Sequence, residues 1–414
     1  MSVPGVILAV AAGREAAIAE ALAGRRDLEV VRRCADLAEA VAAARAGVGS
    51  LVVVSDHPRL TRDVVADLRS HAVAVVGLPS TPEAGEQLRR LGILAVAAHD
   101  ADAAAVADAV ALALHDDSPV AAAAPEEVPL AAGGRMIAVW GPTGAPGRST
   151  LALTLGAELA SRGLQTLVVD ADTHGGAIAQ ACGLLDESPG IAALARIAQH
   201  GSVTAADIAV HAQRLGDHLA VVTGISRPTR WVELPGAALD EVWNAARDAA
   251  HATVVDCGFG LERDEELTYD TRAPQRHAAT LSALEAADVV VAVGSAEPLG
   301  IQRLIHGLAD LREAGIAQPV VVVNRVRADV AGSRPDEAVA DALTRYAGVE
   351  RVWTLPWDPR AADAATLAGR TLVERAPRSR LRRAIAGLAH FLSDDPTWPA
   401  SARTVPAPPA ALSH

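Results

Sequence analysis

The sequence contains no lysine, so all 37 of the residues counted as lysine or arginine are arginine. Every permanent cationic role therefore falls to a guanidinium group, which is planar and bulkier than an ammonium group. Cysteine is scarce as well: Cys34, Cys182 and Cys257 have the spacing of neither a metal site nor a disulfide framework. We expect them to be buried small residues in a protein of the reducing cytoplasm.

Long apolar runs are also missing. No run of about eighteen apolar residues free of charges occurs, which predicts no transmembrane helix. The N-terminal stretch MSVPGVILAVAAGREAA has no basic residue before its apolar part, and we interpret it as a buried strand rather than a signal peptide. The 13 histidines show neither H-x-x-x-H nor H-E-x-x-H spacing, so zinc chemistry has no support. A net charge of -13 argues against a protein that coats nucleic acid everywhere, although it leaves room for a local basic face.

What is present is a regular alternation of short Val-, Leu- and Ile-rich runs with longer Ala-rich helical patterns. This alternation is typical of α/β folds with parallel sheets covered by helices. Because 414 residues exceed what one core usually serves, we expect two doubly wound domains. The first has strands near 5–10, 28–32, 51–54, 73–78 and 93–97, and the second near 136–140, 165–170, 219–222, 252–256, 288–293, 319–324 and 351–355.

The expected organisation has four parts. Residues 1–115 form the first domain and 135–395 the second. Between them, residues 116–134 mix proline, alanine, glycine and acids without periodicity and are interpreted as a linker. The Pro- and Ala-rich tail, 396–414, is predicted to be disordered.

The stretch MIAVWGPTGAPGRSTLAL, residues 136–153, resembles a phosphate-binding loop without lysine. A strand, a Gly-rich turn and the start of a helix place backbone N–H groups and positive potential around one point, where an anion is held. Arg148 occupies the position of the usual lysine, and Ser149 offers a hydroxyl to magnesium. By itself this match is weak.

Acidic residues follow two further predicted strands. Asp170 and Asp172 stand in VVDADTHGG, and Asp256 in VVDCGFG. In open parallel sheets, ligands bind beyond the carboxyl ends of the strands, so these side chains are expected near Ser149. A hydroxyl and carboxylates beside a phosphate cradle predict a magnesium–nucleotide site.

Together these segments resemble the MinD/ParA class of deviant Walker ATPases across essentially all of 135–395. The resemblance implies ATP and Mg²⁺ as cofactors. It implies catalytic roles for Asp172, which would orient the attacking water, and Arg148, and metal-side roles for Ser149, Asp170 and Asp256. It also implies nucleotide contacts from Gly144, Ala145, Pro146, Gly147, Arg148, Ser149, Thr150, Asn324 of PVVVVNRV, and Pro356 and Asp358 of the closing segment.

The first domain resembles a degenerate receiver. Its first strand ends in Ala11-Ala12-Gly13 without acids, Asp56 lies one position late after the third strand, and no lysine follows the fifth. We therefore interpret it as a protein-docking module that is not phosphorylated. The whole arrangement is similar to the CpaE/TadZ branch, in an actinobacterial version sometimes linked to septum placement. This implies protein partners in a pilus, secretion or cell-division machine.

The loop departs from the family pattern K-G-G-x-G-K-[ST] at both lysines, since Thr143 and Arg148 stand there. In the family the first lysine reaches the partner's phosphates, so a weak homodimer and slow hydrolysis are expected. Two alternatives stay open: a nucleotide-binding adaptor that no longer hydrolyses ATP, and a DNA-partitioning ATPase.

Two further stretches have competing interpretations. The predicted 378–392 helix begins with Arg378, Arg380, Arg382 and Arg383, followed by leucines and an isoleucine at helical spacing. It is interpreted mainly as the last helix packed on the sheet. The alternative is that the protein is recruited to the inner face of the plasma membrane or septum, either by this helix or by its protein partners. ISRPTRW, residues 225–231, is interpreted as a surface loop rather than a DNA or partner contact.

Overall fold

The computed structural model describes residues 3–57, 59–115, 133–184, 189–263, 274–316 and 318–394. The chain divides into two compact units, with the main boundary between Ala131 and Ala132. Each unit is described by itself below. Most of the predicted linker and the whole predicted tail lie outside the described residues.

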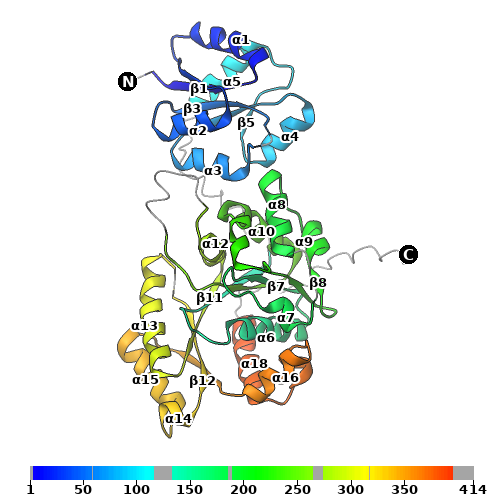
Figure 1. Ribbon diagram of the computed structural model, residues 1–414, viewed down its shortest axis with the longest axis vertical. Coiled ribbons are helices and arrows are strands. Elements are labelled where there is room, and N and C mark those ends of the chain that lie inside the picture. The colour runs from blue at the N-terminus through cyan, green and yellow to red at the C-terminus, as the bar shows by residue number, and fades with distance from the viewer. Residues whose placement is uncertain are drawn as a thin grey trace, which may run out of the picture. The chain divides into compact units, whose positions relative to one another are not determined.

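The N-terminal unit contains a five-stranded, fully parallel sheet in the order β2-β1-β3-β4-β5, which is the flavodoxin-like order. The predicted doubly wound fold is therefore confirmed (Figure 1). Its elements are β1 (Gly5–Ala9), α1 (Ala12–Ala23), β2 (Glu29–Arg33), α2 (Leu37–Arg45), β3 (Leu51–Ser55), α3 (Arg62–Ser70), β4 (Ala74–Leu78), α4 (Pro82–Arg90), β5 (Ala95–Val96) and α5 (Ala103–His115).

Strand β3 shows why its run of apolar residues is continuous. Alternate side chains point to opposite faces of a sheet. Val52 and Val54 pack in one core, whereas Leu51 and Val53 pack in the other, so all four are buried. A central strand covered on both faces needs apolar residues at every position.

The C-terminal unit contains an eight-stranded sheet in the order β13-β12-β11-β6-β10-β7-β9-β8. All pairs are parallel except the short edge pair of β8 (Gln213–Arg214) with β9. The seven predicted strands are all present: β6 (Arg135–Trp140), β7 (Thr166–Ala171), β9 (Leu219–Val222), β10 (Ala252–Cys257), β11 (Val289–Ser295), β12 (Val320–Val326) and β13 (Val352–Pro356). Strand β8 was missed because two exposed polar residues have no apolar pattern.

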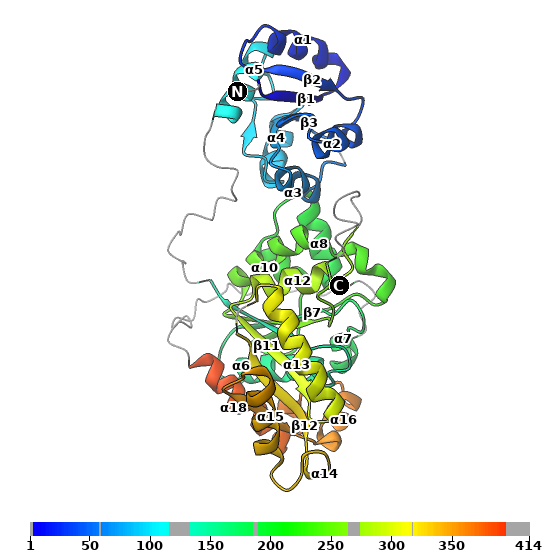
Figure 2. The same cartoon turned by 90° about the vertical axis from the view of Figure 1, so that its left-hand side faces the viewer.

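Helices cover both faces of this sheet (Figures 1 and 2). On one face α6 (Arg148–Ser161) packs against α18 (Arg380–Ser393), and on the other α10 (Gly236–Ala249) packs against α12 (Ala278–Ala286). The remaining helices are α7 (Ile178–Ala181), α8 (Gly190–His200), α9 (Ala205–His211), η1 (Pro228–Glu233), α13 (Pro298–Glu313), α14 (Ala328–Ala331), α15 (Pro335–Ala347), α16 (Pro359–Leu367) and α17 (Leu372–Arg375).

Helix α18 packs in the core, as the main interpretation predicted. Its apolar residues Leu381, Ile385, Leu388 and Leu392 are buried. Arg382 forms an ion pair with Glu158 of α6, with a hydrogen bond of 2.8 Å from Nη2 to Oε2. The membrane alternative for this helix is not supported, because the face it would insert is already buried.

Two smaller predictions also have outcomes. The three cysteines are free and buried, as expected. ISRPTRW runs into the 3₁₀ helix η1, where Arg230 pairs with Glu233 at 2.6 Å, so the loop prediction was wrong for its second half. None of the helices in the described ranges has the length and apolarity that crossing a membrane requires.

Candidate nucleotide site

A turn of seven residues, 141–147, joins the end of β6 to the start of α6. Gly144 and Gly147 have φ angles of +72° and +85°, a region that favours glycine because other residues place Cβ too close to the backbone. Gly147 is the N-cap residue of α6, so the first N–H groups of a 14-residue helix point toward the loop. This geometry suits an anion.

Three carboxylates lie at the carboxyl ends of the neighbouring strands. In β10, Asp256 pairs in register with Asp170 of β7 on one side and with Val139 of β6 on the other. Asp172 follows β7 by one residue. All three are buried, so the structure brings together the acids that the sequence predicts beside the loop.

Asp170 is held by backbone donors. Its Oδ1 accepts a hydrogen bond from the Asp172 N–H at 3.2 Å, and its Oδ2 accepts one from the Ile178 N–H at 3.1 Å. Burial, reinforced by the nearby Asp172 carboxylate, nevertheless raises the pKa of Asp170 to about 7. Both oxygens therefore already brace the turn after β7, and the predicted metal-side role of Asp170 stays a prediction.

Asp256 is different. It is fully buried, and neither of its carboxylate oxygens has a hydrogen-bond partner among the described residues. Burial and repulsion from Asp170 raise the pKa of Asp256 well above its usual value. The nearby Ser149 side chain lowers this pKa, but by less. Such uncompensated groups are rare and call for a physical explanation.

A magnesium ion fits this arrangement. It keeps several water molecules and takes only one or two ligands from the protein, usually oxygens. Ser149, the second residue of α6, lies beside the Asp256 carboxyl group and supplies a hydroxyl. Among the described residues, no group of three or more acidic, histidine or cysteine side chains is arranged to hold a metal alone. A hydrated ion that also contacts phosphate matches this set better than a protein-only site.

Arg148 fills part of the loop. Its Nη1 donates to the Gly141 carbonyl oxygen at 2.8 Å, and its Nη2 donates to Asp172 Oδ2 at 3.1 Å. The other Asp172 oxygen accepts hydrogen bonds from the N–H groups of His174 and Gly175. The two residues predicted to be catalytic thus form an ion pair with each other, in which Asp172 is buried and Arg148 is largely buried.

The residues predicted to contact the base lie on the next strands. Asn324 in β12 donates from Nδ2 to the Pro146 carbonyl oxygen at 3.0 Å, so it contacts the loop itself. Pro356 is the last residue of β13, and Asp358 caps α16 by accepting from the Ala361 N–H at 3.2 Å. Pro356 and Asp358 thus lie just before and at the start of α16, and their roles in contacting the base stay predictions.

Comparisons with known proteins agree with this geometry. The sequence profile of the CobQ/CobB/MinD/ParA nucleotide binding domain matches residues 137–367, more than half of the chain. The chain belongs to this family. Its nucleotide-binding domain therefore includes the loop, all three acids and Asn324. No curated protein matches the sequence.

Solved structures show the same fold for the MinD/ParA-type unit. The cell division ATPase MinD of Pyrococcus furiosus is 23% identical, with a TM-score of 0.50, over 63% of this chain and 98% of that one. A ParA family ATPase from Chlorobium tepidum TLS is 16% identical, with a TM-score of 0.51, over 62% of this chain and 98% of that one. At these identities the likeness concerns the fold alone.

Sequence reasoning missed a cluster beside Asp172. His174 stacks on His277 with ring centroids 5.3 Å apart and lies 4.4 Å from the Phe259 ring. Arg276 donates to the Thr173 hydroxyl at 2.9 Å and lies over Trp231. Burial lowers the pKa of both histidines. His174 and Phe259 stand in the two predicted acidic motifs, but Arg276 and His277 stand in neither, so no signal in the sequence indicated that these residues would meet.

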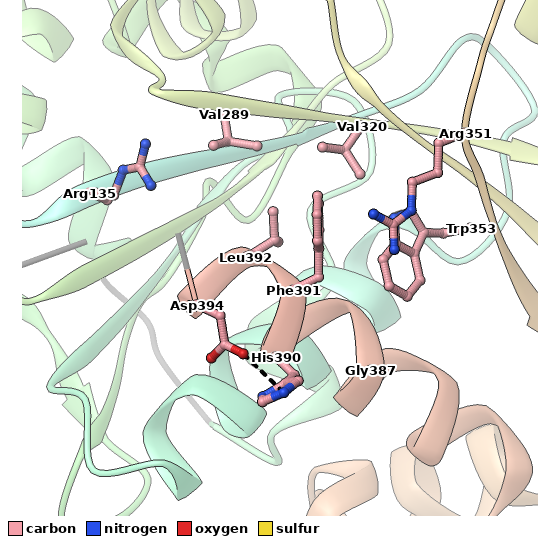
Figure 3. Close-up of a pocket in the computed structure, with 10 residues that line it drawn as sticks. All are labelled: Arg135, Val289, Val320, Arg351, Trp353, Gly387, His390, Phe391, Leu392 and Asp394. Carbon is pink, nitrogen blue, oxygen red and sulfur yellow. Dashed lines mark ion pairs between the residues drawn. The ribbon is translucent and has the colours of Figure 1, made fainter. Parts of the chain in front are cut away.

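A cavity of about 590 Å³ lies at the opposite edge of the sheet (Figure 3). Arg135, Val289 and Val320 contribute the amino-terminal ends of three strands, and residues of α18 complete the lining. Arg351 lies over Trp353 at 4.6 Å. Because nucleotides bind at carboxyl ends of strands, this cavity is not part of the nucleotide site.

Proposed function

We propose that the C-terminal unit binds Mg-ATP and Mg-ADP at the loop, hydrolyses ATP slowly and uses its nucleotide state to control association with protein partners. The observation that supports this most directly is the fully buried Asp256, unsatisfied among the described residues, beside Ser149 and a glycine-shaped loop at a helix N-terminus. Family membership supports nucleotide binding independently.

Each side chain has a separable task in this proposal. The backbone N–H groups of Gly144, Ala145 and residues 147–150 hold phosphate oxygens, whereas Pro146 has no N–H to donate. Ser149 and Asp256 would hold the magnesium ion, Asp256 through water. Bound magnesium neutralises charge on the phosphates and fixes their orientation. Asp172 accepts a hydrogen bond from the attacking water.

Arg148 must change partners for this to happen. In the present arrangement it neutralises Asp172, the residue proposed to orient water. When a nucleotide binds, phosphate oxygens compete for the guanidinium, and Asp172 is released. Nucleotide binding and the release of Asp172 for catalysis are therefore coupled through one ion pair. Basal hydrolysis is slow if Arg148 moves from Asp172 to the phosphates in only part of the molecules.

Titration calorimetry tests nucleotide binding. We expect the wild-type chain to bind Mg-ATP and Mg-ADP, and Arg148→Ala to bind both more weakly. Because this variant leaves the buried Asp172 without its ion-pair partner, its binding is measured below its own unfolding temperature. Arg345→Ala is a matched control, because Arg345 is exposed on α15 and lies over Tyr346. An absence of binding in the wild type would refute the proposal.

The cellular role is proposed from the resemblance to the CpaE/TadZ branch: placement of a pilus, secretion or septum complex, with the N-terminal unit as the docking module. The flavodoxin-like fold of the N-terminal unit supports its proposed role as the docking module. A pull-down with the N-terminal unit disrupted by Leu51→Asp should lose these partners and keep ATP binding. Retention of all partners would argue against docking through this unit.

Two other functions are distinguishable. The Arg148–Asp172 pair also favours an adaptor that binds but does not hydrolyse ATP, and steady phosphate release by the purified protein would exclude it. DNA partitioning would produce a salt-sensitive gel shift, since phosphate contacts release counterions.

A further inference from the structure

Helix α13 lies directly against the phosphate loop. It packs on β11, which neighbours β6 in the sheet (Figure 2). Gly307 on this helix is buried, and a Cβ there would lie 2.9 Å from the Trp140 ring and 3.2 Å from Pro142 Cβ. The absence of a side chain at Gly307 thus lets the helix approach the start of the loop.

Arg303 is one helical turn before Gly307 and lies on the same face of α13. Its guanidinium covers Gly144: a Cβ built on Gly144 would lie 3.5 Å from Arg303 Cζ and closer still to Nη1. Gly144 has room for this contact only because it is glycine. Two glycines, one on each partner, therefore permit the helix and its arginine to reach the loop.

The charge of Arg303 is not neutralised within the described part of the chain. Arg303 is exposed, and no hydrogen bond or ion pair to it is found among those residues. Arg148, by contrast, is shared between Gly141 and Asp172. Of the two arginines next to the loop, only Arg303 is available to an incoming anion without breaking an ion pair.

We infer that Arg303 is a phosphate-contacting residue that supplies, from the same chain, the loop cation missing at Thr143. Thr143 precedes Gly144, so the guanidinium already lies beside the position where the family pattern places its first lysine. An exposed arginine reorients at little cost, and its planar head offers paired donors to phosphate oxygens. The outermost phosphate of a nucleoside triphosphate is the ligand expected, because Gly144 is on the exposed side of the loop.

This inference rests on the proposed nucleotide binding, and its test separates the two. Calorimetry would compare ATP, ADP and AMP, each with magnesium, on the wild type, Arg303→Ala, Arg303→Lys and the control Arg345→Ala. We expect Arg303→Ala to weaken ATP binding about tenfold, which corresponds to about 1.4 kcal/mol. ADP should be affected less and AMP not at all, whereas Arg303→Lys should retain most of the affinity.

Three further readouts make the outcome decisive. The ATP defect of Arg303→Ala should shrink as salt rises, because it is electrostatic. Adding Thr143→Lys to Arg303→Ala should not restore ATP affinity in the monomer, because in the family pattern a lysine at that position reaches the partner's phosphates. The defect should be present at protein concentrations where sedimentation shows a monomer, since the contact is within one chain.

Equal ATP affinity for Arg303→Ala and Arg345→Ala, with normal wild-type binding, would overturn the inference and leave the proposed function intact. A defect that appears only in a dimer would also overturn it, because Arg303 would then act on the partner's nucleotide. A wild type that binds no nucleotide would overturn both. Thermal unfolding without ligand controls for folding, and an exposed arginine predicts little change.

Discussion

The two units share one architecture and treat charge in opposite ways. Both are parallel sheets covered on two faces. Yet every polar or charged residue that is buried in the described part of the chain belongs to the C-terminal unit, from Thr154 to Thr371. The N-terminal unit keeps its charges at least partly in solvent. Buried charge costs stability unless it is paired, and in the C-terminal unit Glu158 and Asp172 are paired with arginines whereas Asp256 is not.

Two aspartates make the contrast concrete. Asp56 follows β3, and its oxygens accept hydrogen bonds from Ser80 N at 2.6 Å and from Ser80 Oγ at 2.7 Å. Asp256, at the corresponding edge of the other sheet, has no such partners among the described residues. The same residue type at the same kind of position is a hydrogen-bond acceptor in one unit and a buried carboxyl without a hydrogen-bond partner among the described residues in the other.

The largest effect is expected from the buried ion pair on the C-terminal sheet. Arg382→Ala leaves Glu158 buried without its partner, which commonly costs about 3–5 kcal/mol. Arg45→Ala breaks the pair with Asp67 on the N-terminal unit, where the carboxylate left behind is less buried than Glu158, and should cost about 1 kcal/mol or less. Urea unfolding of both variants would measure the difference, and equal losses would break the comparison.

The same pair gives a pH dependence. Burial raises the pKa of Glu158 above its usual value despite Arg382. A carboxyl with a raised pKa binds its proton more tightly in the folded state, so its contribution to stability is lost as pH rises through that pKa. The deficit of Arg382→Ala should therefore be smaller at about pH 5 than at about pH 8. A deficit that grows on acidification would contradict this sign.

A smaller but more specific effect is expected at Asp256. Asp256→Asn should weaken magnesium-dependent ATP binding about a hundredfold, or about 2.7 kcal/mol, because an amide cannot supply the negative charge. Without ligand the variant should be more stable than wild type, since a buried unsatisfied carboxylate is removed. Asp56→Asn is the matched control and should leave ATP affinity unchanged. Calorimetry with magnesium and with EDTA would show whether the loss of ATP affinity in Asp256→Asn depends on magnesium.

The loop cation provides a third comparison. Restoring lysine at both pattern positions, Thr143→Lys with Arg148→Lys, should strengthen ATP-driven dimerisation at least tenfold, or about 1.4 kcal/mol. Wild type is expected to dimerise weakly, because Thr143 gives each chain no cation that reaches the partner's phosphates. Sedimentation with ATP would measure it. A tight wild-type dimer at micromolar protein would show that another arginine already replaces the lysine.

The sequence predicted the strands closely because buried parallel strands leave an unambiguous pattern. Runs such as VVVV in β12 are apolar at every position since both faces are covered. The edge strand β8 left no such signal. The three acids were predicted together because carboxyl ends of parallel strands share one edge, which is a property of topology rather than of side-chain detail.

The contacts between side chains that are distant along the chain could not be predicted from the sequence. Nothing in the order of residues indicates that Arg148 would pair with Asp172, or that Asn324 would contact Pro146. Arg303 stands 160 positions after Thr143 in an ordinary amphipathic helix, and only packing through Gly307 brings it to Gly144. Pairing of this kind depends on helix placement, which local patterns do not determine.

The smallest effect is expected at Asp56, and it tests the docking interpretation of the N-terminal unit. Both carboxylate oxygens are engaged by Ser80, and the first strand is followed by Ala11, Ala12 and Gly13 rather than by acids that would hold magnesium. Acetyl phosphate should therefore leave the protein unmodified by mass spectrometry. Asp56→Ala should cost about 1 kcal/mol of stability, since it removes the acceptor from two donors that remain partly open to water. Stoichiometric acid-labile phosphate on Asp56 would instead make this unit a working receiver, and the contrast in charge between the two sheets would lose its functional meaning.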